Sequence, residues 1–219
     1  MCFSASVSFT AGTVLIALGA VTLKKAGHGA ELAYAAIPLL FGVQQLIEGL
    51  LWLSFSSDVP RLNPVVTFVY SLFSHVLWPI YVPLAVLLLE PVRWRRKALA
   101  AFLTAGAAVG LYLLVNMFRF PIESRPVDGH IEYVSSHFYI AAVMVGYLAA
   151  TCISMLFSSH KLVNVFGAAA LLSFGLSYAI YRQWFISVWC FFAAALSVIV
   201  LLRFTNRSFP KESSHGMAV

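Results

Sequence analysis

Charged residues are scarce in this chain. They make up 10% of its 219 residues, and only eight residues are acidic. A soluble globular domain has about one-quarter charged residues, because its water-facing surface must be polar. The scarcity of charge therefore excludes a cytosolic enzyme, a nucleic-acid-binding domain and a disordered chain. With a mean hydropathy of +0.90, the expected partner is the lipid bilayer, and no nucleic acid is expected as a partner.

Cysteine is also rare. The three cysteines are an odd number without a CxxC spacing, which argues against a disulfide framework or a thiolate metal cluster. A basic segment ahead of the first apolar run is missing too, since Lys24 and Lys25 follow that run. A cleavable signal peptide has such a segment. We therefore expect the first helix to stay in the mature protein.

Long apolar runs are abundant instead. A transmembrane helix needs about 20 mostly apolar residues to cross a hydrocarbon core of about 30 Å. Seven segments qualify, at residues 8–23, 32–55, 63–89, 98–118, 137–157, 162–181 and 184–202. The runs are continuously apolar and do not alternate, which excludes a transmembrane β-barrel. The sequence predicts an all-α membrane bundle of seven transmembrane helices in one domain (1–204), followed by a flexible cytoplasmic tail (205–219).

The lysines and arginines predict the orientation of this bundle. Ten of them fall on one side of the predicted membrane, namely Lys24, Lys25, Arg93, Arg95, Arg96, Lys97, Lys161, Arg203, Arg207 and Lys211. Four fall on the other side, namely Arg61, Arg119, Arg125 and Arg182. Because basic loops stay in the cytoplasm, the N-terminus is expected outside and the C-terminus inside. The long loop 119–136 would then face outward as a lid.

Polar residues inside the predicted spans gather in the middle and outer halves. Such residues are costly in a membrane and usually face the protein interior or a water-filled cavity. They are Glu48, Ser71, His75, Asn116, His137, Tyr178 and Cys190. The inner halves contain mostly Ala, Leu, Val and Phe. This asymmetry predicts a pocket open to the outer side, where a small molecule or a lipid would bind.

Glu48 and His75 are the leading candidates for the centre of this pocket. A carboxylate near the middle of the membrane takes up a proton or finds a cation. His75 precedes Pro79 by four residues, and proline lacks the amide that the His75 carbonyl would receive, so this helix is expected to be irregular there. The alternative for both residues is a structural hydrogen bond across a helix interface. As functional residues Glu48 and His75 would be catalytic residues or metal ligands, and Glu48 could also carry a proton or act as a general base. A transition metal such as zinc is the candidate cofactor.

Further side chains are candidates for ligand contacts. They are Cys2, Trp78, Asn116, His137, Tyr178, Trp189 and Cys190, by their predicted depth. Trp78 and Trp189 would otherwise fill the bundle interior. Cys2 and Cys190 both belong to the outer half, so a disulfide between them fits the predicted depths. A thiol ligand or nucleophile, and no role at all, are the alternatives for Cys2.

Two segments resemble an uncharacterised bacterial family of small multi-pass membrane proteins that begin with MCxSA. The segments are MCFSASVSF at the N-terminus and IPLLFGVQQLIEGLLW at 37–52. The resemblance covers the first quarter of the chain clearly and the rest mainly by the number of spans. It implies the bacterial inner membrane and directs attention to Cys2, Gln45 and Glu48. It implies no established activity.

The segment Ser71-Leu-Phe-Ser-His75 is similar to one motif of a membrane hydrolase superfamily. That superfamily includes the alkaline ceramidases and the progestin/adiponectin receptors, whose zinc site combines Ser-x-x-x-His with His-x-x-x-His on the last helix. The similarity implies a catalytic role for Ser71 and His75. The last predicted helix, WFISVWCFFAAALSV, departs from the pattern because it has no histidine.

Two classes of function remain open. In the first, Glu48 and His75 bind a metal, and the protein is a metal-binding protein or a membrane-embedded metal-dependent hydrolase. In the second, the same residues serve a non-enzymatic receptor or a transport protein for protons or solutes. The shortage of polar residues on the cytoplasmic side argues against a pathway through the membrane.

Overall fold

The computed structural model describes residues 4–205, with gaps at residues 28, 60 and 136. Helices dominate the described chain, which confirms the predicted all-α class. Cys2 and residues 206–219 of the predicted tail lie outside the described residues.

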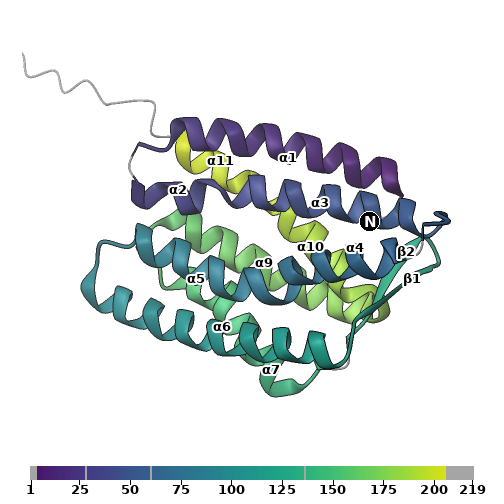
Figure 1. The fold of residues 1–219 in the computed structure, drawn as a ribbon. Helices are drawn as coiled ribbons and strands as arrows, with labels where there is room; N and C mark the ends of the chain where they lie inside the picture. Colours follow the sequence, from purple (N-terminus) through teal and green to yellow (C-terminus); the bar gives the residue numbers. More distant parts are fainter. Residues whose placement is uncertain (1–3, 28, 60, 136, 206–219) are drawn as a thin grey trace, which may run out of the picture.

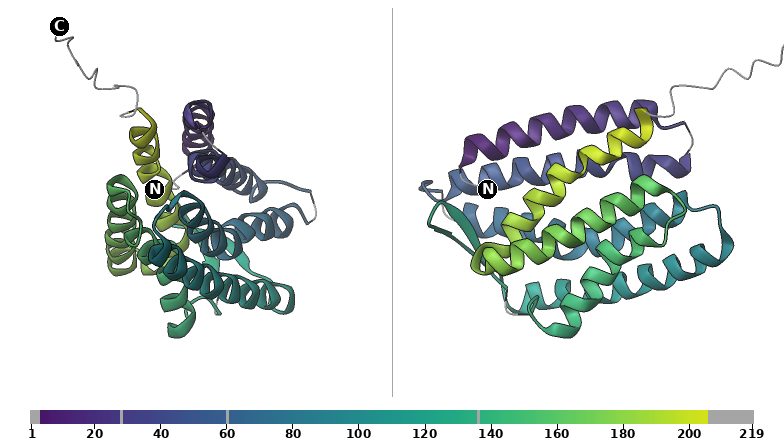
Figure 2. Two further views of the ribbon diagram at one scale, coloured as in Figure 1. Left: turned by 90° about the vertical axis from the view of Figure 1, so that its left-hand side faces the viewer. Right: turned by 180° about the vertical axis from the view of Figure 1, so that it is seen from behind.

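Six helical segments are long and apolar enough to cross a membrane, which indicates a multi-pass membrane protein. They are α1 (Ala5–Lys25), α2 with α3 (Gly29–Ala35 and Ile37–Ser54), α4 with η1 and α5 (Leu62–Ser71, Leu72–Leu77 and Trp78–Leu89), α6 (Arg93–Arg119), α9 (Lys161–Ile180), and η3 with α10 and α11 (Arg182–Trp184, Phe185–Leu196 and Val198–Thr205). The segments form an elongated bundle (Figure 1). Seen from behind, α11 lies beside α1, so segments from the two ends of the sequence are neighbours (Figure 2).

A further apolar segment is shorter than the other six. It consists of α7 (Ala141–Leu148), η2 (Ala149–Ile153) and α8 (Ser154–Leu156). Before it, the ring of His137 lies 4.9 Å from the ring of Phe120, next to the C-terminal end of α6. After it, Arg95 near the N-terminal end of α6 donates to the carbonyl oxygens of Phe157 and Ser158, at 3.1 and 2.6 Å. The segment thus runs between the two ends of the bundle, although its helix is shorter than the span predicted at 137–157.

The long loop that the sequence places between two spans contains a β-hairpin. Strands β1 (Glu123–Val127) and β2 (His130–Val134) pair antiparallel across Asp128 and Gly129. Both turn residues have positive φ values of 49° and 74°, as the two-residue turns favoured by Asp-Gly require. The hairpin packs on α4, where the Ser124 and Thr67 hydroxyls lie 2.7 Å apart. It therefore lies across one end of the bundle (Figure 1).

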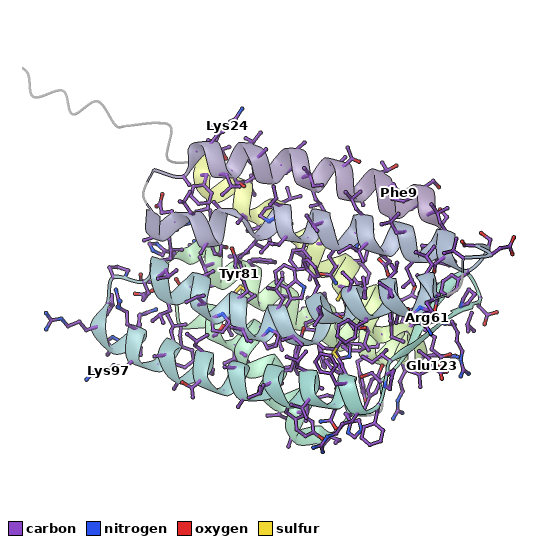
Figure 3. The ribbon with its side chains drawn as sticks, viewed as in Figure 1. Phe9, Lys24, Arg61, Tyr81, Lys97 and Glu123 are labelled. Atoms are coloured by element: carbon purple, nitrogen blue, oxygen red, sulfur yellow. The ribbon has the colours of Figure 1, made fainter. Side chains whose placement is uncertain are left out.

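Basic residues are more numerous at the opposite end of the bundle. Figure 3 shows Lys24 and Lys97 at that end, and Arg61 and Glu123 at the end with the hairpin. The described Lys and Arg residues of the first end are Lys24, Lys25, Arg93, Arg95, Arg96, Lys97, Lys161 and Arg203. Those of the second are Arg61, Arg119, Arg125 and Arg182. We call the two ends the basic end and the hairpin end.

The irregular helix expected around Pro79 is present as the π-helical turn η1, in which the Trp78 amide donates to the Phe73 carbonyl. The next amide in this pattern belongs to Pro79, which has no hydrogen, so the Ser74 carbonyl needs another donor. The Tyr147 hydroxyl of α7 donates to this carbonyl. A proline in one helix is thereby compensated by a side chain from another.

A second proline, Pro83 of α5, also lacks an amide hydrogen, at the place where α5 approaches α6 closely. Pro83 cannot donate to the Pro79 carbonyl four residues earlier. That carbonyl oxygen faces Gly106 of α6, where a Cβ atom would lie only 1.8 Å from it. Only glycine permits this approach, and its Cα hydrogen can act as a weak donor to the carbonyl.

Hydrogen bonds close the basic end. The buried Glu90 carboxylate follows α5 and accepts from the amides of Ser159 and Val92, at 2.6 and 3.1 Å. Burial opposes ionisation of Glu90, but these bonds and the nearby His160 outweigh it and lower the pKa of Glu90 below its usual value. The carboxylate therefore ties the start of α6 to the segment before α9.

Candidate functional site

His75 lies at the buried base of a pocket at the hairpin end. The pocket has a volume of about 210 Å³ and lies between the C-terminal end of α6, the hairpin and the residues before α7. Its polar lining residues are His75, Asn116, Glu123, Ser135 and His137. Three of the predicted site residues, His75, Asn116 and His137, thus meet in one cavity, which we call the hairpin pocket.

Both nitrogens of the His75 ring have hydrogen-bond partners. Nδ1 lies 2.8 Å from the Ser74 hydroxyl, and Nε2 lies 3.0 Å from the hydroxyl of Ser135, which follows strand β2. The ring of Phe138 contacts the imidazole edge-on at 4.9 Å. A neutral imidazole offers one donor and one acceptor, and each can be used here. His75 is therefore held in one orientation and is linked directly to the hairpin.

Asn116 and His137 are less tightly held. The Asn116 side-chain amide donates to the Tyr112 carbonyl of its own helix at 2.8 Å. His137 Nδ1 lies 3.4 Å from the Tyr112 hydroxyl. Both residues are partly exposed, so they can turn toward a ligand with little loss of protein contacts. Together with His75 they offer imidazole and amide groups to a small polar molecule.

Glu48 lies in a different place, in the middle of the bundle. Its two carboxylate oxygens accept from the Ser187 hydroxyl of α10 at 2.8 Å and from the Gln45 amide at 3.2 Å. One turn before Glu48, Gln44 accepts from the Trp78 indole at 2.7 Å. All of these side chains are buried. We call these five residues the glutamate cluster, and Glu48 does not line the hairpin pocket with His75.

An apolar cavity of about 40 Å³ lies beside the glutamate cluster. Among its walls are Trp78, Trp189, Cys190 and Cys152. The Trp189 indole donates to the Ala170 carbonyl at 3.2 Å, so both tryptophans are packed in the interior. Cys190 is buried and forms no disulfide with Cys152, the other described cysteine, and the predicted disulfide with Cys2 involves a residue outside the described part of the chain.

Ser71 and Tyr178 lie away from the hairpin pocket. Ser71 is fully buried at the end of α4, and its hydroxyl has no hydrogen-bond partner within residues 4–205 as described. Tyr178 is near the end of α9, where its ring stacks on that of Phe174 at 6.0 Å. Of the predicted catalytic residues Ser71, Glu48 and His75, only His75 lines the hairpin pocket.

A metal site does not fit these residues. In the described part of the chain, no three His, Cys, Asp or Glu side chains are grouped closely enough to hold a metal ion. Zinc sites in proteins use three or four such ligands. The hydrogen-bond partners of His75 are serines, and those given above for Glu48 are a serine and a glutamine. The prediction of a metal centre at Glu48 and His75 is therefore not supported.

Sequence reasoning missed the hydroxyl groups that complete both sites. Ser135 lies outside the predicted spans, and serine is too common to stand out in a sequence. Ser187 had a stronger signal, since it precedes Cys190 by three residues and so shares a helix face with it. Tyr147 had no signal in the sequence, because its hydrogen bond goes to the Ser74 carbonyl, which is left without a backbone donor by Pro79 of another helix.

Comparisons with known proteins place the chain in a family but identify no activity. No curated protein and no solved structure matches it. A family model matches residues 1–215, which is nearly the whole chain. The chain therefore belongs to DUF6629, a family of unknown function.

Proposed function

We propose that this protein is a multi-pass membrane protein that binds a small polar ligand in the hairpin pocket. The observation that carries the proposal is the buried His75 imidazole at the base of this pocket, held by Ser135 next to strand β2. A ligand that hydrogen-bonds to His75 would compete with Ser135. Binding would therefore break or weaken the bond between His75 and Ser135. A change in the position of the hairpin could then report on the ligand.

The surroundings of Glu48 support binding at one end over transport through the membrane. The cavity beside the glutamate cluster is lined mainly by apolar and aromatic side chains, such as Trp78 and Met155. Such walls offer few partners to an ion or a proton on its way to the basic end. The glutamate cluster is better explained as a set of hydrogen bonds that joins α3, α5 and α10 beneath the pocket.

Seven spans with the N-terminus outside are the topology that we propose. The shorter segment that contains α7 runs from the hairpin end to the basic end, as a seventh span would. The described basic residues are concentrated at the basic end, which the positive-inside rule assigns to the cytoplasm. The hairpin pocket then faces outward. The resemblance noted above implies the bacterial inner membrane.

Cysteine labelling tests this topology. Cysteines in place of Gly129 at the hairpin tip and Lys97 at the basic end, each introduced together with Cys2→Ser, would be treated with a membrane-impermeant maleimide in intact cells or spheroplasts. Labelling at position 129 but not at position 97 is expected. The reverse pattern would contradict the orientation, and the native Cys152 and Cys190 are buried and should react little.

A thermal-shift screen of small polar molecules with the detergent-purified protein tests ligand binding. A hit at 100 times its Kd should stabilise the protein by about 2.7 kcal/mol. Asn116→Ala and His137→Ala should each weaken binding about tenfold, the effect of one hydrogen bond. Thr104→Ala, an exposed position of α6 outside the pocket, is the matched control. Hits that bind equally well to all three variants would contradict the proposal.

A further inference from the structure

A second hollow at the hairpin end is separate from the base of the hairpin pocket. It has a volume of about 360 Å³ and is lined by Glu132 of β2, Tyr139 before α7, Tyr178 of α9 and Arg182 of η3. We call these four residues and the space between them the tyrosine groove. Val134 and Ser135 form the boundary with the hairpin pocket, because they line both hollows.

Opposite charges face this groove from different elements. The guanidinium carbon of Arg182 lies 5.6 Å from the centre of the Tyr178 ring. Glu132 accepts from the Gln183 side-chain amide at 3.2 Å. Tyr139 lines the same hollow as Tyr178, Glu132 and Arg182. Four ionisable side chains thus converge on one surface hollow.

The two charges of the groove do not pair with each other. No ion pair joins Glu132 to Arg182, whereas Glu123 of the same hairpin pairs with Arg125 at 2.6 Å. Arg182 is exposed and Glu132 is half-buried, so both remain accessible from the groove. A cation and an anion held apart in one hollow complement a ligand that carries both signs of charge.

The residue types indicate the chemistry of that ligand. A guanidinium group binds phosphate through paired hydrogen bonds. Tyrosine rings attract ammonium groups over their faces, and the Glu132 carboxylate accepts hydrogen bonds from a primary ammonium. A quaternary ammonium could not donate to Glu132. The groove therefore matches a phosphodiester linked to a primary amine.

The position of the groove favours a lipid as the source of this group. Ile140 follows Tyr139 in the chain, and Ile180 precedes Arg182 by two residues. Their side chains are 44% and 66% exposed, as expected for side chains that face acyl chains. Tyrosine and tryptophan also gather at the headgroup level of membranes, and Trp184 lies two residues beyond Arg182. A lipid at this level would place its headgroup in the groove.

We propose that the tyrosine groove binds the headgroup of a phosphatidylethanolamine-type lipid. The phosphate lies at Arg182, which Tyr178 holds at 5.6 Å from its ring centre, and the ammonium group lies between Glu132 and the ring of Tyr139. This site is independent of the small-molecule site proposed in the hairpin pocket. It would anchor the segments that border that pocket to the membrane surface.

Native mass spectrometry of the full chain with added lipids tests the proposal. Phosphatidylethanolamine should bind more tightly than phosphatidylcholine or phosphatidylglycerol. Arg182→Gln and Glu132→Gln should each weaken its binding about tenfold or more, the loss of one charge-assisted hydrogen bond. Arg119→Gln removes a charge at the same end outside the groove and should leave binding unchanged. If Arg182→Gln does not fold, Arg182→Lys should still weaken binding, because lysine lacks the planar fork.

Three results would overturn this inference. Equal or tighter binding of phosphatidylglycerol, with no effect of Glu132→Gln, would mean a purely cationic surface. Equal effects of Arg119→Gln and Arg182→Gln would mean that the groove is not the site. Binding of soluble glycerophosphoethanolamine as tightly as the lipid would show that the ligand is a free molecule and not a membrane component.

Discussion

Replacing Gly106 with alanine is expected to force α5 and α6 apart. The new Cβ would lie 1.8 Å from the Pro79 carbonyl oxygen and 3.0 Å from the Ala150 side chain. Real Cβ atoms essentially never come closer than 3.0 Å to a neighbour. The two backbones must therefore separate by about 1 Å, and the Pro79 carbonyl, which Pro83 cannot satisfy, loses its contact with the glycine.

The cost can be worked out from these contacts. Overpacking against a rigid neighbour costs about 1–3 kcal/mol, and the lost Cα–H contact adds about 0.5–1 kcal/mol. The higher helix propensity of alanine offsets about 1 kcal/mol of this loss. The expected net loss is about 2 kcal/mol in the free energy of unfolding, measured by chemical or thermal unfolding in detergent.

Gly175→Ala in α9 is the matched control. A Cβ at this glycine meets nothing within 4 Å, so the substitution should be neutral or stabilise the protein by up to about 1 kcal/mol. If Gly106→Ala were as stable as Gly175→Ala, the close approach of α5 and α6 would be refuted. The explanation of the contact by the two prolines would then fail as well.

Three further substitutions test other contacts. Tyr147→Phe removes the donor to the Ser74 carbonyl and should cost about 1–3 kcal/mol in the free energy of unfolding, measured in detergent; an unchanged value would mean that another donor replaces the hydroxyl. Glu90→Gln should make the protein less stable at neutral pH, because the lowered pKa of Glu90 means that folding favours the carboxylate. The advantage of the native chain should be constant above about pH 4.5 and shrink as the pH falls through the lowered pKa, and a pH-independent difference in melting temperature would contradict this. Gly129→Ala should destabilise the hairpin by about 1–2 kcal/mol, because alanine disfavours the φ of 74° at this position. Amide hydrogen exchange in β1 and β2 should become faster, and an unchanged exchange rate would mean that the turn does not need glycine.

Much of the fold follows from local properties of the sequence. Apolar runs and their basic flanks predict the helices and the uneven charge of the two ends, because both depend on residues close together in the chain. The irregularity before Pro79 is equally local, since a missing amide acts within one turn. Depth along each helix was enough to predict that His75, Asn116 and His137 belong to the same half of the bundle.

The hairpin was not predicted, although its turn signal was present. Asp128 and Gly129 are typical of a two-residue β-turn. The flanking residues, such as Ser124 and Pro126, do not alternate strongly between apolar and polar. The strands are stabilised by contacts with other elements, including Tyr133, whose ring stacks on Tyr70 of α4 at 4.7 Å.

Only the tertiary structure decided which polar residues meet. Glu48 and His75 have similar predicted depths, yet one joins Ser187 and the other Ser135. Depth follows from position along a helix, whereas contact depends on which helices are neighbours and how each is rotated. Which helices are neighbours, and how each is rotated, depends on close contacts between segments far apart in the sequence, such as that of Gly106 with Pro79. The sequence by itself determined the apolar helices of membrane length and the uneven charge of the two ends, and helix packing decided which polar side chains meet.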